Sequence, residues 1–147
     1  MKTILVPVNF STASEHAIHA ALSFFQEAGL HCRVILMNTY LPTGSSPDRW
    51  IDAHDAMKRE SSDRLGQELA RLQAEGSPNG FTFETLSYLG SIENVMPHLV
   101  REENVDYVVL GVQPEPRKDR LVKLLNRLPC PILVIPWQNG AAAGPRD

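Results

Sequence analysis

Two groups of side chains have the residue types and spacing for chemistry. The first is a pair of histidines, His16 and His19, three positions apart in a segment with helical periodicity, so that both rings could approach one metal ion. No cysteine and no second histidine pair lies near them in the sequence to complete such a site. We therefore interpret them as surface or half-buried residues of a helix.

The second group consists of Asp48, Asp52, His54 and Asp55, in a loop and at the start of the helix that follows it. Their types suggest general acid–base chemistry. Carboxylates are also expected at a helix N-terminus, because the helix dipole attracts negative charge, and we interpret the group as capping and solubility residues. The sequence has no G-x-S-x-G motif, no Ser/His/Asp signature and no catalytic cysteine context, so we predict that the protein is not an enzyme.

A basic segment runs from Arg117 to Arg127. Its spacing is typical of the solvated face of a helix, which is the interpretation we favour. The alternative is an anion site, for which Arg117 and Lys118 are the best candidates because they lie near the helix start, where backbone N–H groups attract negative charge.

The composition limits the class of protein. A chain of 147 residues with 43% hydrophobic content fits one domain, and a net charge of -3 argues against a nucleic-acid partner. Met1 and Lys2 lead directly into a strand-like run, which leaves no room for a signal peptide, and no apolar run approaches the roughly 18 residues of a membrane span. We expect a cytoplasmic protein without a membrane partner, and free thiols at Cys32 and Cys130.

Five apolar runs alternate with segments of helical periodicity, which predicts an α/β fold in a single domain. The runs are Ile4–Val8, Arg33–Asn38, Phe81–Leu89, Asp106–Gly111 and Pro131–Pro136. Most are continuously hydrophobic, as parallel strands covered on both faces are, whereas the third alternates in part and is expected near a sheet edge. We predict a domain over residues 1–137 and a flexible tail over 138–147.

The first helix is expected to begin at a capping box formed by Thr12 and Glu15. Ser11, just before it, either contacts a ligand or helps to cap the helix, and we favour capping. A later helix is expected to follow Ser91 as its N-cap and to bend at Pro97.

Four segments of the sequence form a recognisable combination: ILVPVNFSTASEHAIHAA at the start, VILMN, GSIENVMPHLVREENVDYVVLG, and PCPILVIP near the end. In this combination the chain resembles the universal stress protein (UspA) family. The resemblance implies a Rossmann-like sandwich of the adenine nucleotide alpha hydrolase-like type, with a five-stranded parallel sheet in the order 3-2-1-4-5. It also implies a homodimer formed through the last strand, Pro131 to Pro136.

With that strand order, a ligand crevice is expected where the first and fourth strands end. Adenine nucleotides are the ligands that the resemblance suggests. The candidate crevice residues are Pro7, Asn9, Ser11, Thr39, Leu110, Gly111 and Arg117.

The phosphate-binding part of the family pattern is incomplete. ATP-binding relatives end the first strand in Asp, where this chain has Asn9, a poorer ligand for a hard cation. The family motif G-x2-G-x9-G-S/T begins at Gly111, but its second glycine falls on Pro114 and its last pair on Leu124-Leu125. The loss of two or three backbone–phosphate bonds, each of roughly 1.5–3 kcal/mol, would weaken binding by orders of magnitude.

We therefore expect a universal-stress-protein-like binding or regulatory module in stress response, with Mg-ATP binding weak or lost and no certain cofactor. The alternative is a protein that binds an adenine nucleotide (ATP, AMP or a cyclic nucleotide) with at most slow ATP hydrolysis.

Overall fold

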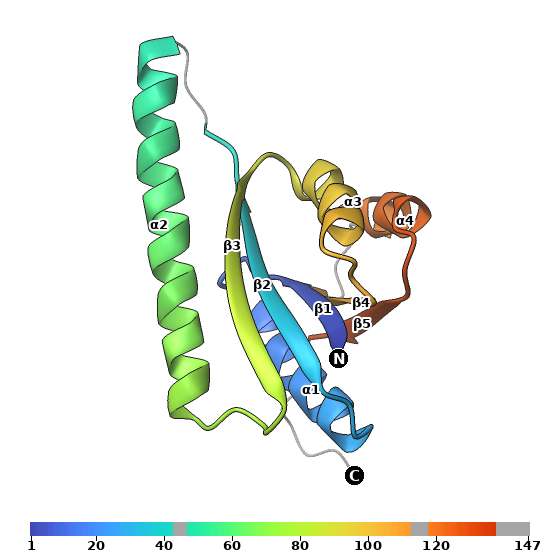
Figure 1. Cartoon of the computed structure of the whole chain (residues 1–147). Helices are drawn as coiled ribbons and strands as arrows, with labels where there is room; N and C mark the ends of the chain where they lie inside the picture. Colours follow the sequence, from blue (N-terminus) through green and yellow to red (C-terminus); the bar gives the residue numbers. More distant parts are fainter. Residues whose placement is uncertain (43–46, 113–117, 138–147) are drawn as a thin grey trace.

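The protein is a layered α/β domain in which helices cover both faces of one sheet (Figure 1). The computed structural model describes residues 1–42, 47–112 and 118–137, with side chains described from residue 51 in the second helix and from residue 122 in the fourth. The strands are β1 (Lys2–Pro7), β2 (Cys32–Tyr40), β3 (Phe81–Leu89), β4 (Tyr107–Val112) and β5 (Ile132–Pro136). The helices are α1 (Thr12–Glu27), α2 (Pro47–Ala74), α3 (Ile92–Glu102) and α4 (Lys118–Arg127).

The sheet is parallel and has the order β3-β2-β1-β4-β5, which confirms the predicted topology. Side chains alternate between the two faces of the sheet, so that each central strand contributes residues to two hydrophobic cores. Ile4 and Val6 of β1 pack on the side of α1 and α2, whereas Leu5 packs on the side of α3 and α4. Both faces of β1, β2 and β4 are therefore apolar, which explains their continuous hydrophobic runs.

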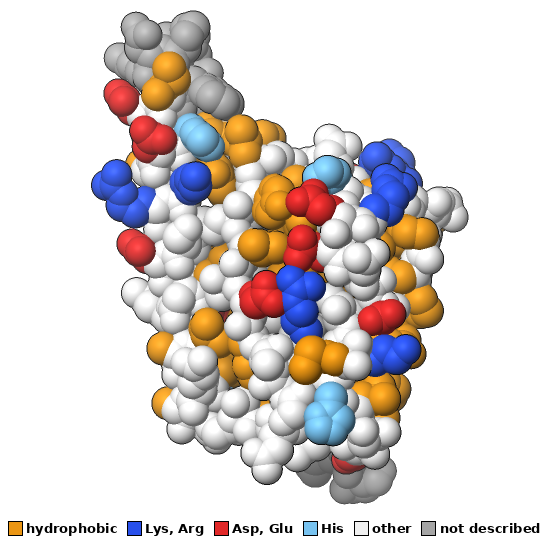
Figure 2. Space-filling view, viewed as in Figure 1, with side chains coloured by type: hydrophobic (Ala, Val, Ile, Leu, Met, Phe, Trp, Pro, Cys, Tyr) orange, Lys and Arg blue, Asp and Glu red, His pale blue; other side chains and the backbone are white. Residues whose placement is uncertain are grey.

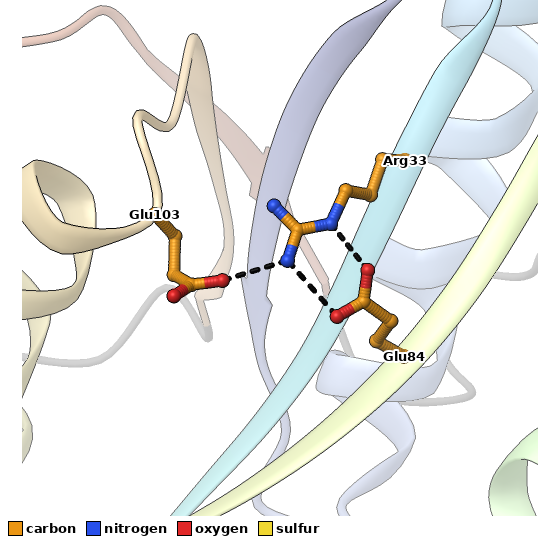
Figure 3. A network of polar contacts seen from close by, with 3 residues as sticks. All are labelled: Arg33, Glu84 and Glu103. Atoms are coloured by element: carbon orange, nitrogen blue, oxygen red, sulfur yellow. Dashed lines mark hydrogen bonds and ion pairs between the residues drawn. The ribbon is translucent and has the colours of Figure 1, made fainter.

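β3 is an edge strand, as its alternating pattern predicted, and its residues are half-buried or exposed. A charged network ties it to the rest of the domain (Figure 3). Arg33 of β2 donates two hydrogen bonds to Glu84 of β3, one from Nε and one from Nη2 at 2.9 Å. The same Nη2 also donates to Glu103, just after α3, at 2.6 Å. These hydrogen bonds from Arg33 lower the pKa of the Glu84 carboxyl group.

The start of α1 differs from the expected capping box. Ser11 is the N-cap: its backbone is extended (φ -89°, ψ 164°), and its hydroxyl accepts a hydrogen bond from the Ser14 N–H at 3.2 Å. Thr12 already belongs to the helix, and the Glu15 carboxylate pairs with Arg71 of α2 at 3.2 Å instead of closing a box. Ser11 therefore caps the helix, as we favoured, but Thr12 does not.

α2 and α3 each run without a break. α2 has 28 residues, and its first turns project past the carboxyl ends of the strands (Figure 1). α3 begins after Ser91, whose side chain makes no capping hydrogen bond, and runs through the buried Pro97. In the part of the chain that the structure describes, no helix has the length and apolar character needed to cross a membrane. Acidic and basic side chains are interspersed on the face seen in Figure 2.

Candidate functional site

The predicted crevice lies where β1 and β4 stop pairing. Their register is Ile4 with Tyr107 and Leu5 with Val108, and it ends there although both strands continue. Backbone N–H groups alternate in direction along a strand, and the Val8 N–H donates to Met37 of β2 at 2.7 Å. The N–H of position 7 would therefore face β4, and Pro7 has none. The pairing of β1 with β4 ends at this point because β1 lacks the donor that would continue the ladder.

Asn9 and Ser11 form a small hydrogen-bonded unit at the edge of this crevice. The Asn9 Oδ1 accepts from the Ser11 N–H at 3.1 Å and from the Ser11 hydroxyl. That hydroxyl thus donates its proton to Asn9 and accepts from the Ser14 N–H in capping α1, so it has no donor left for a ligand. Asn9 is exposed, and among the described residues its Nδ2 donates no hydrogen bond, which makes this amide N–H₂ the group that Asn9 can offer to a ligand.

Phe10, between them, has a left-handed backbone with φ 63°. A phenylalanine rarely adopts this conformation, so its surroundings must hold it there. Its ring packs against the core beneath α1 and α2, and the Arg64 guanidinium lies over the ring at 4.2 Å from the centroid. The sequence carries no signal for this conformation, since neither glycine nor asparagine occupies the position.

Gly111 has a packing role that sequence reasoning missed. A Cβ atom at this position would lie 2.5 Å from the Ala13 carbonyl oxygen and 2.9 Å from the Ala17 Cβ. The glycine and the two alanines thus let α1 approach β4 closely. Leu110, before it, is 6% exposed and packs in the opposite core, so only its backbone could meet a ligand.

At the end of β2, Thr39 is half-buried and pairs with Tyr88 of β3. Its neighbour Asn38 donates to the Val8 carbonyl at 2.7 Å and accepts from the Ser61 hydroxyl of α2 at 2.7 Å. The Ser61 hydroxyl also lies 2.7 Å from that of Ser87. This network joins β1, β2, β3 and α2 beside the crevice.

Several sequence predictions fall outside the crevice or outside the described residues. Arg117, the Pro114 segment and the side chains of Asp48, Lys118 and Arg120 belong to the part that the structure does not describe. His16 and His19 do not share a site: the His16 ring packs on Trp137, with centroids 4.8 Å apart, and the His19 Nε2 lies 3.6 Å from Glu75. Within the described residues no group of three or more His, Cys, Asp or Glu side chains could hold a metal ion.

His54 makes contacts with β2, whereas we expected it to be a capping or solubility residue. Its ring stacks on Tyr40 with centroids 5.5 Å apart, and its Nε2 lies 3.1 Å from the Tyr40 hydroxyl. His54 therefore joins the first half of α2 to the end of β2.

Burial raises the pKa of Tyr40 and, in the same way, those of the Cys32 and Cys130 thiols.

Solved structures share this architecture over nearly the whole chain. A universal stress protein UspA from Lactobacillus plantarum superposes with a TM-score of 0.73, at 17% identity over 91% of this chain and 97% of that one. A universal stress protein family protein from Arabidopsis thaliana with AMP bound has a TM-score of 0.67, at 16% identity over 100% and 98% of the two chains. One from Archaeoglobus fulgidus in complex with dAMP has a TM-score of 0.62, at 14% identity over 92% and 98%.

The comparison with curated proteins found no match. The sequence itself matches the Universal stress protein family over residues 1–136, from the first strand to the last. Together with the strand order β3-β2-β1-β4-β5, this match confirms the resemblance: the chain belongs to the universal stress protein family.

Proposed function

We propose that the protein is a ligand-binding regulatory module that takes an adenine nucleoside monophosphate in the crevice between β1 and β4 and binds Mg-ATP weakly or not at all. The observation that carries the proposal is the Asn9–Ser11 unit. The Asn9 oxygen already accepts two hydrogen bonds from Ser11, and the group that Asn9 has left to offer is a neutral donor.

This chemistry disfavours a magnesium–triphosphate complex. Mg²⁺ in nucleotide sites is held through carboxylates and substrate phosphates, and an amide N–H₂ cannot coordinate it. Pro114 and Pro116 in the sequence after β4 also remove two backbone donors that a triphosphate would use. A ribose hydroxyl, in contrast, is a suitable acceptor for the Asn9 amide.

A monophosphate needs less of the missing loop. The pairing of β1 with β4 ends at Leu5 and Val108, so beyond them backbone groups are available to the edge of an adenosine. The AMP-bound relative from Arabidopsis thaliana and the dAMP complex from Archaeoglobus fulgidus have the same fold, and they supply the ligand class for the proposal.

Isothermal titration with AMP, adenosine and Mg-ATP tests the proposal. We expect AMP to bind more tightly than Mg-ATP, and chelation of the magnesium to leave AMP binding unchanged. Low-micromolar binding of Mg-ATP, on the order of -8 kcal/mol, would overturn it.

The variant Asn9→Asp sharpens this test. An aspartate can accept the same two hydrogen bonds from Ser11 and adds a charged oxygen for a cation next to the start of α1, where negative charge is favourable. We expect Asn9→Asp to fold normally and to make nucleotide binding stronger in the presence of Mg²⁺. An unchanged magnesium dependence would show that Asn9 does not face the phosphates.

We further propose that the protein forms a homodimer through β5 and the preceding Pro131. β5 is the other edge of the sheet, and its residues Ile132–Ile135 are half-buried in the single chain. An apolar edge strand favours pairing across a two-fold axis.

A further inference from the structure

A small open-sided cleft lies between α1 and α2 and shares Ser11 with the predicted crevice. Its volume is about 130 Å³ and polar atoms form most of its lining. An engineered cavity of about 150 Å³ in another protein takes up a molecule of benzene, so a small organic molecule can fit. Three residues at the start of α1 and four along α2 line the cleft: Phe10, Ser11 and Glu15, then Arg64, Gln67, Glu68 and Arg71.

One end of the cleft carries excess negative charge. The Glu68 side chain is only 9% exposed, and its nearest charged partner is the Nη1 of Arg71 at 3.4 Å. The same Nη1 pairs with Glu15 at 3.2 Å, so two carboxylates share one guanidinium. Among the described residues no hydrogen bond reaches the Glu68 carboxylate.

Burial accordingly raises the pKa of Glu68, while Arg71 opposes this shift. A buried carboxylate with one imperfect ion pair is costly unless a further donor reaches it. The cleft gives such a donor access to Glu68, because Glu68 forms part of its lining.

The other end carries the positive charge of Arg64. Its guanidinium lies over the Phe10 ring at 4.2 Å. Among the described residues its ion pair is the long contact, 3.9 Å, with the exposed Glu60. The aromatic ring holds the guanidinium in place without using its N–H donors. Gln67 also lines the cleft, and Arg64 and Glu68 are about one helical turn apart, about 6 Å along the axis.

We propose that this cleft binds a small zwitterion of the amino-acid type, such as alanine or serine. The carboxylate of the ligand pairs with Arg64 and accepts from the Gln67 amide, and its ammonium group donates to Glu68 and Glu15. A simple anion would lie close to the Glu68 and Glu15 carboxylates, and a simple cation would lie close to Arg64. A ligand with both charges satisfies both ends.

Nuclear magnetic resonance of the ¹⁵N-labelled full chain tests the proposal through three ligands of similar size. L-alanine carries both charges, propionate only the negative one, and alaninamide only the positive one. We expect saturable shifts of the Ser11 and Gln67 signals with alanine at millimolar concentrations, and none with the other two. Equal shifts with propionate or alaninamide would refute the zwitterion, and the absence of shifts with alanine at tens of millimolar would show a cleft filled by water alone.

Two substitutions then locate the ligand. Arg64→Gln and Glu68→Gln each remove one charge-assisted partner, and each should weaken alanine binding at least tenfold. The matched controls are Arg59→Gln, at an exposed position of α2, and Glu27→Gln, at an exposed position of α1. Both should bind alanine as the wild type does. Circular dichroism confirms that each variant is folded, and wild-type affinity in folded Arg64→Gln and Glu68→Gln would overturn the proposal. AMP titrations of the same variants keep this result separate from the nucleotide crevice.

Discussion

The close contact between α1 and β4 makes the substitution Gly111→Ala a sharp test of the structure. The new Cβ would lie 2.5 Å from the Ala13 carbonyl oxygen and 2.9 Å from the Ala17 Cβ. Ordinary contacts are about 3.5 Å or more, so the helix or the strand must move by about 1 Å. The closest atom belongs to the backbone of α1 and cannot escape by a change of rotamer.

Overpacking of this kind costs about 1–3 kcal/mol, and a backbone clash places Gly111→Ala near the upper value. For a chain of this size we expect the melting temperature to fall by about 6–12 °C, since each kcal/mol shifts it by about 2–4 °C. Gly66→Ala in α2 is the matched control, because its Cβ would meet no atom within 4 Å. Replacing a glycine in a helix interior should stabilise the protein by about 0.5–1 kcal/mol.

Urea denaturation of both variants measures this difference, with the slope of the transition as a check on two-state unfolding. The two substitutions should change the free energy of unfolding in opposite directions. If Gly111→Ala left stability within about 0.5 kcal/mol of the wild type while AMP binding was lost, Gly111 would serve the ligand and the packing argument would be wrong.

Three other predictions follow from the described contacts. Ser11→Ala should lower the free energy of unfolding by about 1 kcal/mol because it removes the N-cap, whereas Thr12→Ala should change it by less than about 0.5 kcal/mol in urea titrations; equal losses would contradict the assignment of the cap. Arg33 lowers the pKa of Glu84 in the folded protein. The ion pair therefore stabilises the fold above the pKa that Glu84 has in the unfolded chain, and this stabilisation is lost as the pH falls through its pKa in the folded protein. The melting temperature of Glu84→Gln should therefore fall less than that of the wild type between about pH 5 and pH 3. Identical pH profiles of the two melting temperatures would count against the network. Val134→Lys should lower the mass found by light scattering, since it places a charge within β5, and a dimer of unchanged mass would exclude that interface.

Much of the fold could be predicted because its signals are periodic. Continuous apolar runs identified the covered strands, and partial alternation placed Phe81–Leu89 at an edge, where β3 lies. Element ends were less accurate: β2 continues to Tyr40, two residues beyond the predicted strand, because its pairing with β3 extends that far. Ser11 and Thr12 are both good N-cap types, and only backbone geometry distinguishes them.

The sequence predicted where the candidate residues lie in the fold, and their packing roles only in part. Pro7 and Asn9 lie where the strand order required, because the carboxyl ends of parallel strands meet at one edge. Gly111 gave no sign of its packing role, since that role depends on a helix almost a hundred residues earlier in the sequence. The sequence analysis did not identify Arg64 and Glu68, because they line a cleft only through the approach of α1 to α2.

Glu84 has a consequence for solubility beyond its ion pair with Arg33. β3 is an open edge of nine residues, rich in aromatic and β-branched side chains, and Glu84 is its one charged residue. Edge strands of this composition can pair with strands of other molecules, and a central charge is the usual protection. Arg33 keeps that carboxylate ionised at lower pH than it would be alone, so the ion pair also protects the protein from aggregation in mild acid.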